Sequence, residues 1–370
     1  MKVLLVSPYS DKLVGGITNW TRYIVSYQQE NGGNVDLTLL NNENATQVMD
    51  VTNLVKRLFA GLSNYLPVLR QFKKKVGNEH YDVAHICTSA SFGLIRDLMI
   101  VNAARKKGVK AVVHTHFGRI PQVITSKGWE GRLFRRLANR ADCIAVMDKS
   151  SLKALQDNGY ENVRFVPNPL STDVQRSIED LGEMEREPRK IVFAGHVLAS
   201  KGLRELVEAC REIYQVKVEI LGKVSDETFR EMLYQIGGKD STRWLSIPGN
   251  KPFEEVLYEM KSCGVFVLPS YSEGFPNVIL ESMACGCPIV ATSVGAMPEM
   301  LDADGEKPCG ICVPPQNIEA LRDAIISLLG DPKKAKELGE NARKRVNEQY
   351  DILKVWKQLV GLWEEVMNER

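Results

Sequence analysis

The segment VLPSYSEGFPNVILESMA, residues 267–284, contains a complete strand-loop-helix unit. Its apolar start is typical of a buried strand, and Pro276 suits the first turn of a helix, where its missing N–H would have no partner anyway. Short runs rich in Val and Ile alternate with longer amphipathic stretches along the rest of the chain. This alternation is the pattern of parallel sheets covered by helices on both faces, so the sequence predicts an α/β fold.

The predicted strands form two series. The first series comprises Val3–Val6, Val35–Leu40, Val83–Ile86, Ala111–His114, Cys143–Met147 and Arg164–Val166. The second comprises Ile191–Ala194, Val216–Leu221, Trp244–Ile247, Val265–Leu268 and Ile289–Thr292. Each series opens with a strand, a glycine-bearing loop and a helix, which predicts two doubly wound, Rossmann-like domains that would face each other across a ligand-binding cleft.

The polar stretch between the two series has no long apolar run and is the best candidate for a linker. We therefore predict an N-terminal domain over residues 1–170, a linker over 171–188 and a C-terminal domain over 189–349. Residues 350–370 carry an apolar stripe at helical spacing, so we expect a final helix that is a candidate to pack back on the N-terminal domain.

Length and composition exclude several classes of protein. The 370 residues are 44% hydrophobic and 25% charged, which is typical of a soluble globular chain of two large domains. No apolar run approaches about 18 residues, and the opening run is too short for a signal peptide. We therefore expect a cytoplasmic protein whose eight cysteines are free thiols.

Two patterns suggest a metal but stand in the wrong context. Cys285-x-Cys287 and Cys309-x-x-Cys312 resemble zinc ligands, yet their apolar surroundings favour packing over metal binding. Asp302-Ala303-Asp304 has the Asp-x-Asp spacing of metal-dependent sugar transferases, but a glycine follows and a turn is the better interpretation. We predict no metal site.

The segment 267–284 also carries chemistry. Amides around Pro276 and Asn277 should point out of the helix start and form an anion site. Glu273 lies in the loop and Glu281 about one turn into the helix, so both carboxylates can approach one ligand at different depths.

Glu273 and Glu281, within SEGFPNVILESMA, resemble the double-glutamate signature of the retaining, GT-B-fold glycosyltransferases of family four. The resemblance extends along nearly the whole chain. It includes Gly15-Gly16, Val166-Pro167-Asn168, Gly195 through Lys201-Gly202, and the run 286–292.

The resemblance implies a nucleotide-diphosphate sugar as donor, with no metal and no further cofactor. Negative charge builds on the leaving diphosphate, and preorganised positive groups and amides must stabilise it. By resemblance, Lys201 contacts the diphosphate, Glu273 touches the transferred sugar and Glu281 holds the ribose hydroxyls. Amides near Gly15, Gly16, Phe275, Pro276 and Asn277 complete the cradle.

Histidines add two further predictions. The family pattern has arginine where this chain has His196, and an imidazolium could still bond to phosphate, although packing is the alternative. His114 and His116 follow an apolar strand, and the resemblance favours His116 as the residue that faces the donor sugar. A pair that simply caps the strand is the alternative, and His85 is interpreted as a core histidine.

The charge divides unevenly along the chain. Residues 1–170 hold 23 Lys and Arg against 13 Asp and Glu, and the remainder holds 25 against 33. A basic N-terminal half favours an anionic partner, such as a phosphate-bearing acceptor or an acidic membrane surface. Basic residues next to apolar stripes support membrane contact, although ordinary helix packing explains the stripes equally well. They are Lys56, Arg57, Lys73, Lys74, Lys75, Arg132, Arg135 and Arg136.

We therefore predict a retaining, metal-independent glycosyltransferase acting on a glycan or lipid-linked acceptor, with no nucleic-acid partner. Its predicted location is the cytoplasm, with a peripheral position at the cytoplasmic face of the membrane as the alternative. The alternatives are a sugar-nucleotide epimerase on the same fold and a non-catalytic anion-binding protein.

Overall fold

The computed structural model describes residues 1–10, 15–43 and 54–369, and of residues 54–64 only the backbone. The chain forms two compact units. Unit 1 comprises Met1–Pro169 and Ile352–Arg370, and unit 2 comprises Leu170–Asp351. Each unit contains a six-stranded sheet in which every strand pair is parallel. The predicted α/β, Rossmann-like fold is confirmed.

Unit 1 has the strand order β2-β1-β3-β4-β5-β6. Its strands are β1 Lys2–Ser7, β2 Asp36–Asn41, β3 Val83–Thr88, β4 Lys110–Thr115, β5 Cys143–Val146 and β6 Val163–Phe165. Its helices are α1 Gly16–Asn31, α2 Leu54–Asn78, α3 Gly93–Lys106, α4 Ile120–Thr125, α5 Trp129–Ala138, α6 Lys149–Asp157 and α16 Ile352–Asn368.

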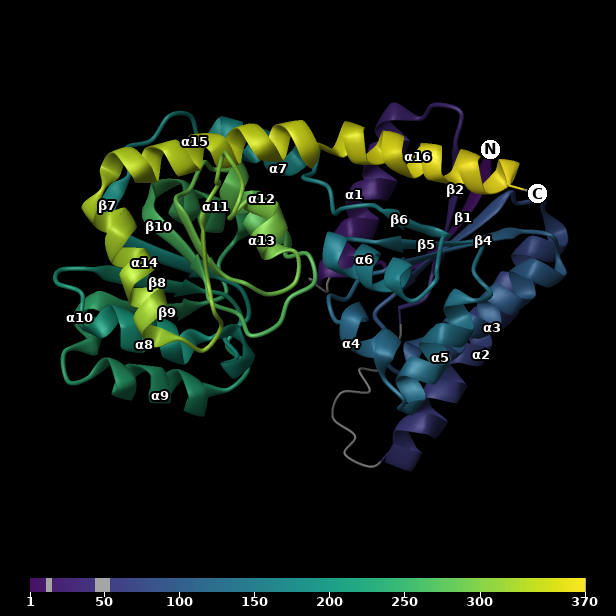
Figure 1. The fold of residues 1–370 in the computed structure, drawn as a ribbon, viewed down its shortest axis with the longest axis horizontal. Helices are drawn as coiled ribbons and strands as arrows, with labels where there is room; N and C mark the ends of the chain where they lie inside the picture. Colours follow the sequence, from purple (N-terminus) through teal and green to yellow (C-terminus); the bar gives the residue numbers. More distant parts are fainter. Residues whose placement is uncertain (11–14, 44–53, 370) are drawn as a thin grey trace. The chain divides into compact units, whose positions relative to one another are not determined.

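The two faces of the first sheet differ in chemistry. Figure 1 shows α1 and α16 on one side and α2, α3 and α5 on the other. Side chains alternate between the faces of a strand, so Ala84 and Ile86 join the apolar core beneath α2 and α3, whereas His85 and Cys87 point to the opposite face. The α1 and α16 face therefore carries buried imidazole and thiol groups.

Unit 2 has the strand order β12-β11-β10-β7-β8-β9. Its strands are β7 Glu187–Ala194, β8 Lys217–Leu221, β9 Leu245–Gly249, β10 Cys263–Leu268, β11 Ile289–Thr292 and β12 Ile311–Val313. Its helices are α7 Thr172–Asp180, the 3₁₀ helix η2 Ala199–Lys201, α8 Leu203–Arg211, α9 Glu227–Gly237, α10 Ser241–Trp244, α11 Phe253–Ser262, α12 Asn277–Ala284, α13 Met297–Met300, α14 Ile318–Gly330 and α15 Pro332–Gln349.

The structure differs from the predicted linker over residues 171–188. Ser171 caps α7 by accepting a hydrogen bond from the Val174 amide at 3.3 Å, and Val174 and Ile178 are buried. The stretch then enters β7 at Glu187, and all of it belongs to unit 2. Two apolar residues one helical turn apart were sufficient to fix this helix, although the segment has no long apolar run.

Every predicted strand is present, and one further strand, β12, completes the second sheet. The final helix, α16, belongs to unit 1, where Arg164 on β6 forms an ion pair with Glu365. Within the described residues, no helix is long and apolar enough to cross a membrane.

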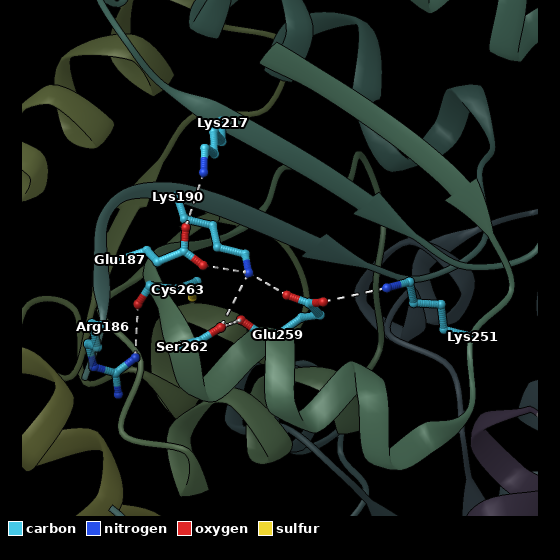
Figure 2. A network of polar contacts seen from close by, with 8 residues as sticks. All are labelled: Arg186, Glu187, Lys190, Lys217, Lys251, Glu259, Ser262 and Cys263. Carbon is cyan, nitrogen blue, oxygen red and sulfur yellow. Dashed lines mark hydrogen bonds and ion pairs between the residues drawn. The ribbon is translucent and has the colours of Figure 1, made fainter. Parts of the chain in front are cut away.

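A buried charge network supports the start of the second sheet, in β7 and α11 (Figure 2). Lys190 is paired with Glu259, and their side chains are 8% and 12% exposed. Burial is the largest single effect and opposes the charge on both groups, but their hydrogen bond and mutual attraction together outweigh it, so the pKa of Lys190 is raised and that of Glu259 lowered. Loss of one partner would leave the other charge buried, so we assign this network to stability.

Candidate active site

The strand order of unit 2 reverses between β7 and β10, and such a switch point is where doubly wound sheets bind ligands. The loop after β7 leads to Lys201, and the loop after β10 carries Glu273. Lys201 Nζ lies 2.6 Å from Glu273 Oε1. Two residues predicted to act on the donor, 72 positions apart in the sequence, therefore meet at the expected edge of the sheet.

Close backbone contacts fix these two loops. Gly202 has φ +68°, and an added Cβ would lie 2.0 Å from the carbonyl oxygen of Pro269. Gly295 has φ +56°, and its Cβ would lie 2.3 Å from the carbonyl oxygen of Glu273. Only glycine permits both the left-handed conformation and this approach. The glycines therefore let the loops pack against the backbone that carries Glu273.

Hydrogen bonds made by Tyr271 tie the Glu273 loop to the segment around Lys201. The Tyr271 amide donates to the Ser200 carbonyl at 2.9 Å, and the Tyr271 hydroxyl lies 2.7 and 2.8 Å from the two carboxylate oxygens of Glu205. Burial and the adjacent Glu205 carboxylate raise the pKa of Tyr271 to about 12, so the phenol remains a donor. Sequence reasoning missed this pair, because nothing in the spacing of Glu205 and Tyr271 indicates that they meet.

Lys201 and Glu273 form an ion pair that is partly shielded from solvent. Their side chains are 26% and 13% exposed, so solvent screens them only in part. At an effective dielectric constant of about 20, two unit charges about 4 Å apart interact by about 4 kcal/mol before desolvation is subtracted. The ammonium group of Lys201 is thus held in place by the Glu273 carboxylate.

The start of α12 contributes backbone groups at the same edge. Pro276 is the N-cap, and the first amides of a helix have no intrahelical partner. The Phe275 ring is buried and packs edge-on against Tyr350, with centroids 5.5 Å apart. Phe275 therefore anchors the loop through its side chain, while Pro276 and Asn277 begin the helix.

Glu281 lies further along α12 and is only 8% exposed. Burial raises the pKa of its carboxyl group to about 7. In the part of the chain that the structure describes, no side chain or amide donates a hydrogen bond to this carboxyl group. A buried acid in this state can accept hydrogen bonds from ligand hydroxyls.

His196 lies just after β7, near two lysines. Partial desolvation and the charges of Lys201 and Lys223 lower the pKa of its imidazole. The Val197 amide donates to the Lys223 carbonyl at 3.0 Å, which brings the loops after β7 and β8 together. Lys223 is a second residue that the sequence analysis missed; its position directly after Gly222 at the end of β8 was the available signal.

The remaining predicted residues lie at the carboxyl edge of the first sheet. Gly15 is the N-cap of α1, and a Cβ added at Gly16 would meet no atom within 4 Å, so packing does not require glycine there. The His116 amide donates to the Thr88 carbonyl at 2.8 Å. Burial, followed by the neighbouring His114 and His85, holds the pKa of His116 well below its usual range, so the ring is neutral.

A cluster of buried rings lies behind His116. Trp363 of α16 donates its indole N–H to Nδ1 of His85 at 3.0 Å, and Nε2 of His85 lies 3.3 Å from Nδ1 of His114. Because an indole N–H can only donate, His85 accepts at Nδ1 and donates from Nε2 to His114. The His114 and His116 rings are 4.2 Å apart, and Trp20 of α1 packs against all three imidazoles.

His85, Cys87 and His114 are close enough together to hold a metal ion. However, the lone pair of His85 Nδ1 already accepts from Trp363, so the ring carries its proton on the nitrogen that faces His114. Burial also raises the pKa of Cys87 to about 12, so in the metal-free protein this group is a thiol. The hydrogen bonds thus fit a proton-bearing cluster and not a metal site.

The other cysteine and aspartate patterns consist of buried thiols and a turn. All eight cysteines are free, and burial raises the pKa of Cys309 to about 11 and of Cys312 to about 12. Asp302 lies in a turn, where its carbonyl accepts from the Gly305 amide at 2.9 Å and its carboxylate lies 3.5 Å from Arg345.

The predicted basic surface divides into two kinds of residue. Lys73, Lys74, Arg132 and Arg136 are exposed. Arg135 instead donates to the carbonyl groups of Ile124 and Ser126 at the end of α4. The side chains of Lys56 and Arg57 lie outside the described residues. The apolar residues beside these bases, such as Phe72 and Phe134, are buried in the core and are not available to a membrane.

Comparison with known proteins agrees with this architecture. The family model Glycosyl transferases group 1 matches residues 175–345, and Glycosyltransferase Family 4 matches residues 14–174. The chain is 36% identical over 306 residues to the MMP alpha-(1->4)-mannosyltransferase of Mycolicibacterium hassiacum, covering 78% of this chain and 71% of that protein. It is 24% identical to the putative teichuronic acid biosynthesis glycosyltransferase TuaC of Bacillus subtilis, covering 80% and 79%.

The crystal structure of Anabaena Alr3699/HepE in complex with UDP-glucose has the same fold. It superposes with a TM-score of 0.68 and 16% sequence identity, covering 99% of this chain and all of that one. Two matching family models, one on each half of the chain, and a relative above 30% identity agree with the two parallel sheets. The chain therefore belongs to the group 1 glycosyltransferases and has their two-domain GT-B fold.

Proposed function

We propose that this glycosyltransferase moves a hexose from a nucleotide-diphosphate sugar to a hydroxyl group of a growing cell-surface glycan, with retention at the anomeric carbon and without a metal. The observation that carries the proposal is the contact of 2.6 Å between Lys201 and Glu273 at the switch point of the second sheet. The UDP-glucose complex of Anabaena Alr3699/HepE and the polysaccharide role in the name of TuaC support the donor and acceptor classes.

The donor would be bound through three features of unit 2. The ammonium group of Lys201 and the first amides of α12 would face the diphosphate, because cations and helix N-termini both stabilise phosphate charge. Glu281 would accept hydrogen bonds from the ribose hydroxyls, since its buried carboxyl group lacks a protein donor among the described residues.

Catalysis would then follow from charge. Cleavage of the bond between sugar and phosphate moves negative charge onto the diphosphate, and the prepositioned Lys201 would stabilise that charge as it develops. Glu273 would orient Lys201 through their ion pair and touch the transferred sugar. His116 would present a neutral imidazole as a hydrogen-bond partner.

The test is a transfer assay with a panel of nucleotide sugars and candidate acceptors, first narrowed by thermal shift. Nucleoside diphosphate should be released only when acceptor is present. Lys201→Ala and Glu273→Gln should each reduce turnover by at least about a hundredfold, the usual effect of removing one transition-state donor. The exposed Lys239→Ala is the matched control and should retain activity. Unchanged turnover in Lys201→Ala would refute the assignment.

Metal independence and stereochemistry are tested on the same reaction. Activity should survive excess chelator, and NMR of the early product should give the anomeric configuration of the donor. Loss of turnover that magnesium or manganese restores would contradict the role given to Lys201 and α12. A product of inverted configuration would contradict retention.

A lipid-linked acceptor at the cytoplasmic face of the membrane is the finer part of the proposal. It is supported by the excess of positive charge over residues 1–170, of which Lys73, Lys74, Arg132 and Arg136 are exposed. Because Phe72 and Phe134, which lie beside these bases, are buried in the core, we propose contact through charge rather than insertion of these side chains.

A further inference from the structure

An exposed tryptophan stacked on a half-buried phenylalanine lies at the carboxyl edge of the first sheet. Trp129, the first residue of α5, is 51% exposed. Its ring stacks on Phe92, with centroids 4.9 Å apart and an angle of 19° between the planes. Phe92 directly precedes α3, in the loop that follows β3. The pair presents a flat apolar surface, which we name the aromatic platform.

A hydrogen-bonded frame holds the platform in place. Arg119, in the loop after β4, donates to both carboxylate oxygens of Glu130, at 2.8 and 2.6 Å. Glu130 also accepts from the Ser91 amide at 2.8 Å. Glu130 follows Trp129 and Ser91 precedes Phe92, so the frame fixes the residues next to both rings.

The backbone beneath the platform is equally constrained. Ala90 and Ser91 have φ values of +68° and +54°, a conformation that residues other than glycine rarely adopt. A Cβ added at Gly131 would lie 2.3 Å from the Ser126 carbonyl oxygen, so only glycine allows α5 to cross α4 this closely. The position of Trp129 is therefore built into the fold, although the indole contributes little to the core.

We infer that the aromatic platform binds the apolar face of a pyranose ring in the acceptor glycan. The inference depends on the proposed function only in naming the ring as the acceptor. A pyranose has an apolar face of C–H groups and a rim of hydroxyls, which matches a stacked indole surrounded by charged and hydroxyl groups. Arg119, Glu130 and Ser91 supply those groups beside the rings.

The charge of the frame favours a sugar over a membrane surface. A site for anionic headgroups would present uncompensated cations within the frame, but the frame's one cation, Arg119, is matched by Glu130 in a two-pronged pair. The exposed Arg132 lies one turn further along α5, so the vesicle experiment below separates the two ligands. Their mutual hydrogen bonds raise the pKa of Arg119 and lower that of Glu130, so both remain charged at neutral pH. A neutral frame that both donates and accepts suits sugar hydroxyls.

The location agrees with an acceptor site. Phe92 of the platform follows closely after Thr88 at the end of β3, and Arg119 of the frame follows closely after His116 at the end of β4. Thr88 and His116 are themselves joined by a hydrogen bond of 2.8 Å. His116 is proposed to face the reacting sugar, so a ring on the platform would lie along the same edge of unit 1. The ends of the neighbouring strands β3 and β4 thus lead to both His116 and the aromatic platform.

The test uses the full chain labelled with 5-fluorotryptophan and observed by fluorine NMR. The probes are methyl pyranosides of glucose, galactose and mannose, maltotriose, and separately vesicles of neutral and of anionic lipid. We expect pyranosides or maltotriose to shift the Trp129 signal, which is assigned by its loss in Trp129→Phe. The buried Trp363 serves as an internal reference. No shift with any sugar, or a shift with vesicles alone, would overturn the inference.

Kinetics supply a second readout once a donor and acceptor are known. Trp129→Ala should raise the KM for acceptor by about tenfold, equivalent to about 1.4 kcal/mol, with donor KM and kcat unchanged. Trp129→Phe should recover part of the loss. Tyr258→Ala, which removes a ring of 49% exposure from unit 2, is the matched control.

The two experiments separate the inference from the proposed function. Binding of sugar at Trp129 without any transfer would refute the function and leave the platform standing. Transfer with an acceptor KM unaffected by Trp129→Ala would refute the platform and leave the function standing.

Discussion

Glu281 gives the sharpest test, because stability and donor binding should respond to it in opposite directions. The substitution Glu281→Gln keeps the size of the side chain but removes its titration. Burial raises the pKa of Glu281 from an ordinary 4.5 to about 7, and its side chain is 8% exposed. At about 1.4 kcal/mol for each tenfold change, this rise corresponds to about 3 kcal/mol.

The direction in which stability changes with pH follows from proton binding. Between pH 4.5 and about 7 the native state holds a proton on Glu281 that the unfolded state has released. The stability of the wild type relative to Glu281→Gln should therefore fall as pH rises through this window, and it should remain at the lower level above it. Above about pH 7 the variant should be the more stable protein, by up to about 3 kcal/mol.

Urea unfolding of both proteins across this pH range measures the difference. Glu254→Gln, at an exposed position on α11, is the matched control and should show no such trend. Donor binding should change the opposite way, because ribose hydroxyls donate best to an ionised carboxylate. Calorimetry should therefore give weaker nucleoside-diphosphate binding in Glu281→Gln. A stability difference that is constant with pH would refute the buried acid, and unchanged affinity would refute the ribose role.

Three further predictions concern other parts of the molecule. Tyr271→Phe should lower kcat by about tenfold with near-normal donor affinity, because loss of the Glu205 hydrogen bonds frees the loop that positions Glu273. Unchanged kcat in steady-state assays would contradict this prediction. His196→Ala should weaken nucleoside-diphosphate binding mainly below pH 6.5, since the pKa of the free imidazole is lowered, and a flat pH profile in both proteins would assign His196 to packing. Changing Lys73, Lys74 and Lys75 to Ser should weaken binding to anionic vesicles, measured by co-sedimentation, by about 1 kcal/mol for each lysine near the surface. Equal binding of the wild type to neutral and anionic vesicles would contradict an electrostatic attraction.

The order and type of the elements could be predicted from the sequence. Strands of a parallel sheet are buried on both faces, so they read as continuous apolar runs such as Val83–Ile86, bounded by glycine-bearing loops. The same reasoning located the loop after β10 and the start of α12. The edge strand β12, Ile311–Val313, was not predicted because three residues, two of them partly exposed, leave too short a signal.

The candidate site was predictable only in part. Lys201, Glu273 and Glu281 stand in a motif whose order along the chain carries the resemblance to the family, so their residue numbers followed from the sequence. The partners that position them did not. Tyr271 and Glu205 are 66 residues apart, and neither residue type nor local spacing indicates that one bonds to the other.

The sequence by itself determined two doubly wound domains, because local apolar periodicity and glycine placement encode strands, helices and loops. The residues predicted for the site came instead from the resemblance to a family. Only the tertiary structure decided which side chains meet. Trp363 contacts His85 across 278 residues. The aromatic platform joins the loop after β3 with the start of α5, and its frame adds Arg119 from the loop after β4. Such contacts depend on which strands become neighbours and which helix covers each face, and no local pattern carries that information.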